Sequence, residues 1–63
     1  MYTTIEEMEQ DFLDGNLGNL ANFMCHAACE FFDGISDCTC LEWFVANDYF
    51  ETTEEALEYY DHN

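Results

Sequence analysis

The 63-residue chain contains no lysine and no arginine, although it carries fifteen aspartates and glutamates. A chain of this length ordinarily has about seven or eight basic residues, because roughly a quarter of the residues in globular proteins are charged, with both signs represented. The formal net charge is −15 with histidine neutral. Ion pairs with lysine or arginine are excluded, and the carboxylates repel one another. A surface of one sign therefore indicates a basic partner.

Proline is also absent, and glycine occurs only three times. This scarcity favours helices joined by short loops. The hydrophobic content of 49% and the aromatic content of 17% are typical of a chain that folds, unlike the aromatic-poor acidic chains that stay disordered. Sixty-three residues are enough for a single domain spanning 1–63, which buries only ~60% of the surface that its unfolded form exposes.

The sequence has no apolar run of the ~18 residues that a membrane span requires. Its N-terminal residues form neither the basic nor the apolar region of a secretory signal. Anionic lipid headgroups would repel so acidic a chain. We therefore expect a cytoplasmic protein whose four cysteines stay reduced.

A first helix is predicted to begin at overlapping capping boxes, which pair Thr3 with Glu6 and Thr4 with Glu7. The turn residues that follow position 13 end it. Apolar side chains recur on one face at helical spacing, and these are Ile5, Met8 and Phe12.

A second helix is predicted over 17–32, with Asn16 or Asn19 as its N-cap. It contains only one charged residue, Glu30, and its apolar residues cover most of the circumference. Such a helix belongs in the middle of a bundle. The predicted core-facing series is Leu17, Leu20, Ala21, Met24, Ala27, Ala28 and Phe31, and the polar strip is Asn19, Asn22, His26 and Glu30.

Two shorter helices are predicted in the remaining chain. One spans about 38–47 after a cap at Ser36 or Asp37, and the other runs from a cap at Thr52 or Thr53 to about Tyr60. The sequence thus predicts an all-α fold, a compact bundle of three to four short helices around the central apolar helix at about 17–32.

The four cysteines allow three interpretations. Cys25 and Cys29 border the predicted apolar arc, so the first interpretation is that the cysteines are reduced core residues and that the protein has no cofactor. The second is a zinc site made by Cys25, Cys29, Cys38 and Cys40, with His26 as an alternative ligand. The spacing C-H-x2-C-x8-C-x-C matches none of the usual zinc patterns. The third is a disulfide or redox role.

The sequence offers little support for catalysis. Cys25 and His26 are adjacent and diverge by ~100° on a helix, so the imidazole is poorly placed to activate the thiol. No glycine-rich phosphate loop is present, and no basic residue is available to hold an anionic substrate. We therefore expect that the protein is not an enzyme.

Carboxylates recur at i, i+4 and i+7 along the first and last helices. Like charges at this spacing destabilise an isolated helix by ~0.2–0.5 kcal/mol each, so rows of them indicate a functional surface. Fifteen charges on a domain ~25–28 Å across approach the linear charge density of B-DNA, which is one charge per ~1.7 Å. The rows are Glu7, Asp11 and Asp14; Glu51, Glu55 and Glu58; and Glu54, Glu58 and Asp61.

In its length, its lack of basic residues, its aromatic-rich core and these acidic rows, the chain resembles the small DNA-mimic inhibitors encoded by bacteriophages and mobile elements. This class includes anti-CRISPR and anti-restriction proteins. The resemblance implies that the protein binds the basic nucleic-acid-binding cleft of a bacterial defence nuclease, in the cytoplasm of an infected host. It implies a CRISPR effector first and a restriction enzyme second, with no direct binding of nucleic acid or membrane.

An acidic adaptor that binds a basic host protein, such as a polymerase subunit, is the alternative. Aromatic side chains would then anchor the complex, and the candidates are Trp43, Tyr49 and Tyr60. A symmetric homodimer would lengthen the acidic surface in either case. A zinc-stapled interaction module remains the third hypothesis.

Overall fold

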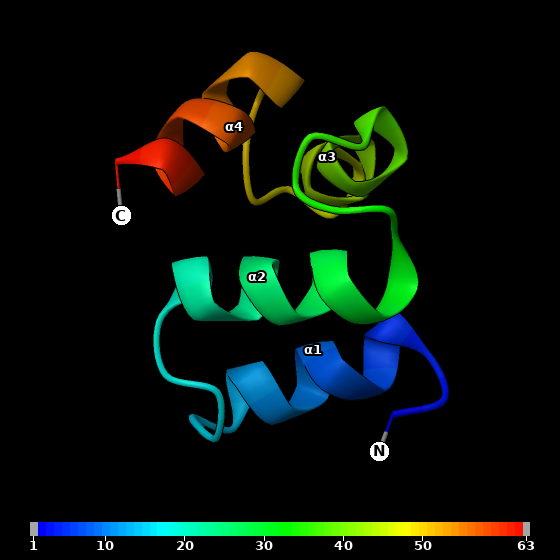
Figure 1. Cartoon of the computed structure of the whole chain (residues 1–63). Coiled ribbons are helices and arrows are strands. Elements are labelled where there is room, and N and C mark those ends of the chain that lie inside the picture. The colour runs from blue at the N-terminus through cyan, green and yellow to red at the C-terminus, as the bar shows by residue number, and fades with distance from the viewer. Residues whose placement is uncertain (1, 63) are drawn as a thin grey trace.

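The computed structural model, which describes residues 2–62, consists of four helices. They are α1 (Ile5–Leu13), α2 (Leu20–Phe31), α3 (Cys38–Ala46) and α4 (Thr53–Asp61), and the described residues form no strand. In Figure 1, α1 and α2 lie side by side and run antiparallel, while α3 and α4 lie on the other side of α2. The all-α bundle predicted from the sequence is confirmed.

Helix α1 begins where the second of the two predicted capping boxes places it. The Thr4 side chain accepts a hydrogen bond from the Glu7 backbone N–H, and the Glu7 carboxylate accepts one from the backbone N–H of Thr4. Two backbone donors that helix formation leaves without partners are satisfied in this way. Ile5 and Met8 are buried and Phe12 is half-buried, as the apolar spacing predicts.

Helix α2 is shorter than the predicted 17–32. Of the two candidate caps, Asn19 is the one used, and its side chain accepts a hydrogen bond from the Asn22 backbone N–H at 2.9 Å. Gly18 precedes it with φ of 76°, a left-handed conformation that a glycine adopts without strain and that separates Leu17 from the helix. At the other end Phe32 is extended and closes the helix.

Helices α3 and α4 start at aspartate and threonine caps. Asp37 accepts a hydrogen bond from the Thr39 backbone N–H at 2.9 Å, and Thr52 accepts one from the Glu55 backbone N–H at 3.1 Å. After α3 the chain turns at Asp48, whose φ of 68° is left-handed. Aspartate is among the few residues that tolerate this conformation.

Helix α2 packs against the other three helices. Its buried residues are Phe23, Met24, Ala27 and Ala28. The Phe23 ring stacks on Phe12 from α1 at 4.9 Å between centroids and meets the edge of Phe44 from α3 at 5.4 Å. The predicted central role of this helix is therefore confirmed. The whole core consists of Ile5, Met8, Phe23, Met24, Ala27, Ala28, Cys40, Leu41, Phe44 and Ala56.

Only one side of α2 is buried, however. Asn22, Cys25, His26 and Cys29 are all exposed, because the other helices leave this sector of α2 open. None of the helices formed by residues 2–62 has the length and apolar character that crossing a bilayer requires.

Candidate functional site

All fifteen carboxylates lie within residues 2–62, and none of them is buried. Twelve of the positions are classed as exposed, the exceptions being Glu9, Asp11 and Asp37, which are half-buried. The structure nevertheless divides these groups into two kinds. Some accept hydrogen bonds from within the protein, and others face solvent with no such bond.

The acidic row predicted on α1 belongs to the first kind. Glu7 caps the helix, and its carboxylate accepts hydrogen bonds from the backbone N–H groups of Thr3 at 3.0 Å and Thr4 at 3.1 Å. Asp11 accepts a 2.6 Å bond from the Tyr2 hydroxyl. Asp14 accepts a 3.1 Å bond from the Gln10 side-chain amide. Each of these three carboxylates thus contributes to the local structure of α1.

Two carboxylates of α1 that lie outside the predicted acidic rows connect this helix to the α3 region. Glu9 accepts a 2.6 Å hydrogen bond from the Tyr49 hydroxyl, and Glu6 accepts a 3.4 Å bond from the Trp43 indole N–H. Burial, and then the hydrogen bond to Glu9, raise the pKa of Tyr49 above its usual range. Pairs 40 and 37 residues apart carry no local sequence signal, so only the tertiary structure reveals them.

The three predicted aromatic anchors are half-buried, and each of them packs against the core of the protein. Trp43 stacks on Tyr49 with 6.1 Å between centroids and 20° between planes, and its edge contact with Phe44 is at 5.0 Å. Because Trp43 and Tyr49 also donate hydrogen bonds to α1, they act as parts of the fold. Tyr60 lies apart from this cluster, on α4.

The acidic rows of α4 contain carboxylates of the second kind. Glu54, Glu58 and Asp61 are exposed and accept no hydrogen bond from the described residues. Glu55 differs, since it accepts a 3.0 Å bond from the Glu51 backbone N–H. An open depression of about 500 Å³ runs along this face. Its lining residues are Thr52, Glu54, Glu55, Glu58, Tyr59 and His62.

The two acidic helices do not form one continuous row. Helix α1 packs on one side of α2, and α4 lies on the other side (Figure 1). The acidic rows predicted on α1 and on α4 therefore lie on different sides of the molecule. The α4 rows place several unbonded carboxylates on one helix, where they are available to accept hydrogen bonds from a partner.

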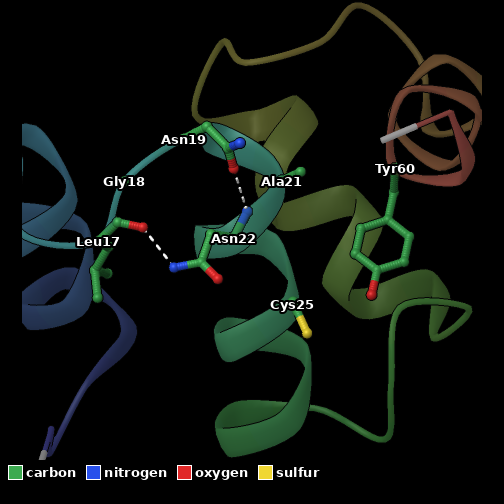
Figure 2. Close-up of a pocket in the computed structure, with 7 residues that line it drawn as sticks. All are labelled: Leu17, Gly18, Asn19, Ala21, Asn22, Cys25 and Tyr60. Atoms are coloured by element: carbon green, nitrogen blue, oxygen red, sulfur yellow. Dashed lines mark hydrogen bonds between the residues drawn. The ribbon is translucent and has the colours of Figure 1, made fainter.

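A second depression, of about 440 Å³, contains no charged residue (Figure 2). It lies between the start of α2 and Tyr60 of α4. Asn22 links the residues that precede α2 to the start of the helix. Its side-chain amide donates a 2.5 Å hydrogen bond to the Leu17 carbonyl, and its backbone N–H donates one to the Asn19 side chain. The lining residues are Leu17, Gly18, Asn19, Ala21, Asn22, Cys25 and Tyr60.

The prediction that the cysteines are core residues is wrong for three of the four. Cys25, Cys29 and Cys38 are exposed free thiols, and only Cys40 is buried. Burial, with a smaller effect of the Asp37 charge, raises the pKa of the Cys40 thiol to about 11. Cys25 and Cys29 lie at the edge of the apolar arc of α2, and the neighbouring helices leave both residues exposed.

The four-ligand zinc site is not formed either. Within residues 2–62, no three side chains of histidine, cysteine, aspartate or glutamate converge so that they could hold a metal ion. Cys40 is enclosed in the core while Cys38, two residues earlier, is exposed, so these two thiols do not share a face.

No protein-family model matches this chain, and no curated protein and no solved structure shows detectable similarity to it.

Proposed function

We propose that this protein is a DNA mimic that occupies the basic nucleic-acid-binding cleft of a bacterial defence nuclease. A CRISPR effector is the first target to test, and a restriction enzyme is the second. The protein would act in the cytoplasm of an infected bacterial cell. The observation that carries the proposal is the surface of a single sign, formed by fifteen unburied carboxylates and no lysine or arginine.

The dimensions of the molecule support this proposal. Its longest extent is 28 Å, so fifteen charges correspond to one per ~1.9 Å, close to the one per ~1.7 Å of B-DNA. A cleft that has evolved to neutralise phosphates would meet a similar charge density on this protein. Such a complex forms rapidly at low salt and weakens as salt screens the charges.

The α4 surface is the expected centre of the contact. Lysine and arginine side chains that bind phosphates donate hydrogen bonds to oxygen acceptors, and the carboxylates of Glu54, Glu58 and Asp61 have acceptor positions that no residue of the described chain occupies. They are already fixed on one helix, so little backbone ordering is needed on binding. The bonded carboxylates of α1 contribute mainly to the long-range field.

A nuclease-treated pull-down from a bacterial lysate that contains the candidate nuclease tests the proposal, followed by binding measurements on the purified complex. Affinity should fall steeply between low and high salt, and duplex DNA should compete for the site. Binding that is indifferent to both salt and DNA would show that mimicry is wrong.

Two triple variants with equal charge change locate the contact. The test variant carries Glu54→Gln, Glu58→Gln and Asp61→Asn. The control carries Asp14→Asn, Glu30→Gln and Asp33→Asn, which are exposed positions away from α4. We expect the test variant to lose more affinity than the control. Equal losses would assign binding to net charge alone, without a special role for α4.

A further inference from the structure

The exposure of two cysteines on α2 calls for an explanation. Free cysteine is among the residue types most often buried, yet Cys25 and Cys29 are both exposed on α2, a helix with only one charged residue. They are four residues apart within one continuous helix. Side chains at this spacing lie one above the other, with about 5–6 Å between their Cβ atoms. Both thiols therefore project from the same face.

The depression beside Cys25 is lined by uncharged residues, unlike much of the surface. Cys25 lies at the edge of the depression that contains no charged residue, with Tyr60 of α4 across from it. Figure 2 shows the Tyr60 ring across the depression from Cys25. One thiol of the pair and the Tyr60 phenol thus line the same depression at the α2–α4 contact.

We propose that Cys25 and Cys29 together bind one Cu(I) ion as a two-thiolate site. Thiolates are the soft ligands that select Cu(I), and Cu(I) accepts two ligands in a nearly linear arrangement. Two metal–sulfur bonds of about 2.3 Å, the length found in zinc thiolates, span ~4.6 Å, which is close to the separation of the two Cβ atoms. A two-ligand site is consistent with the finding that no larger donor group exists among residues 2–62.

The binding step is balanced without any oxidant. Each thiol loses one proton, and the two resulting thiolates form bonds to one Cu(I), so two protons are released for each ion bound. The Tyr60 hydroxyl, across the depression from Cys25, would donate a hydrogen bond to the metal-bound thiolate and so act as a positioning residue. The net charge of −15 adds a field that concentrates cations near the protein. This inference is independent of the proposed function.

Titration of the reduced full-length chain with Cu(I) under anaerobic conditions tests the site, in competition with the chromogenic Cu(I) chelator bicinchoninate. The wild type should retain one Cu(I) per chain, and its elution volume in size-exclusion chromatography should be the same with and without the ion. Cys25→Ser and Cys29→Ser should each abolish this retention. Cys38→Ser is the matched control, since Cys38 is also an exposed thiol, and it should retain the ion as the wild type does.

Tyr60→Phe should retain the ion with about tenfold lower affinity, the size of effect that loss of an outer hydrogen bond has on a metal site. Circular dichroism would establish that each variant is folded. The proposal is overturned if the folded wild type retains no Cu(I), if Cys38→Ser loses it as fully as Cys25→Ser, or if one ion is shared by two chains.

Discussion

The hydrogen bond between Tyr49 and Glu9 offers the sharpest test of how this fold is held together without lysine or arginine. The Tyr49 hydroxyl donates to a Glu9 carboxylate oxygen at 2.6 Å and so joins the segment after α3 to α1. Tyr49→Phe removes only the hydroxyl. The ring contacts that Tyr49 makes with Trp43, Phe44 and Phe23 remain available to phenylalanine.

The expected loss is about 1.5 kcal/mol in the free energy of unfolding. Hydrogen bonds to charged groups contribute about 1.5–3 kcal/mol. The lower end applies because Tyr49 and Glu9 are half-buried, so water can replace part of the lost bond. In a domain of this size the melting temperature should fall by about 6–12 °C.

Urea denaturation of the wild type, Tyr49→Phe, Glu9→Ala and the double variant measures the interaction as a double-mutant cycle. Glu9→Ala alone removes the bond but also relieves repulsion among carboxylates, so its own effect on stability is ambiguous and only the coupling is diagnostic. A coupling energy below ~0.3 kcal/mol would refute the reasoning. Tyr2→Phe, which removes a bond of the same length to Asp11, is a control that does not join separate helices.

The same bond predicts the behaviour at alkaline pH. The folded-state pKa of Tyr49 is raised above the unfolded value of ~10, first by burial and then by the hydrogen bond to Glu9. A group with a raised pKa contributes its full stability below the unfolded pKa and loses it as pH rises through the folded pKa. The wild type should therefore lose stability above about pH 10 more steeply than Tyr49→Phe. Parallel curves for the two proteins would contradict this explanation.

Three further predictions follow from the charge distribution, the thiols and the caps. Raising the salt concentration from ~10 to ~500 mM should increase the melting temperature in a thermal scan. Salt screens the repulsion among the carboxylates, and the chain has no lysine or arginine ion pair to lose. A decrease in the melting temperature would contradict this prediction. Three thiols should react with Ellman's reagent at pH 8 in the folded protein, whereas Cys40 should react only after unfolding. Cys40 is buried, and burial raises its pKa to about 11. Four thiols that react equally fast would be inconsistent with the structure. Thr52→Ala should lower the unfolding free energy by about 1 kcal/mol in urea, because it removes the N-cap of α4, whereas Thr53→Ala should have the smaller effect.

The helices were predictable because their determinants are local. The capping box of Thr4 and Glu7 and the cap at Asn19 or Thr52 depend on residues two to three positions apart, and the structure confirms each of them. The apolar spacing correctly indicated Met8, Met24 and Ala27 as core residues, since the helical period alone places them on the inward faces of their helices. The sequence offered two candidate N-caps for α2, and only the structure showed that Asn19 is used instead of Asn16.

The roles of individual side chains were harder to predict. Cys25 and Cys29 lie at the edge of an apolar arc, and whether such an edge is buried depends on how far the neighbouring helices extend over it. The acidic rows were visible in the sequence, but nothing in their spacing distinguished the hydrogen-bonded carboxylates of α1 from the unbonded ones of α4.

By itself the sequence determined an acidic set of short helices around an apolar one, because composition, capping and periodicity act within a few residues of each other. The tertiary structure alone decided that aromatic hydroxyl and indole groups serve as donors to Glu6 and Glu9, that α1 and α4 lie on opposite sides of α2, and that three of the four thiols face solvent. The physical reason is that these features depend on packing between segments as much as 40 residues apart, which no local pattern encodes.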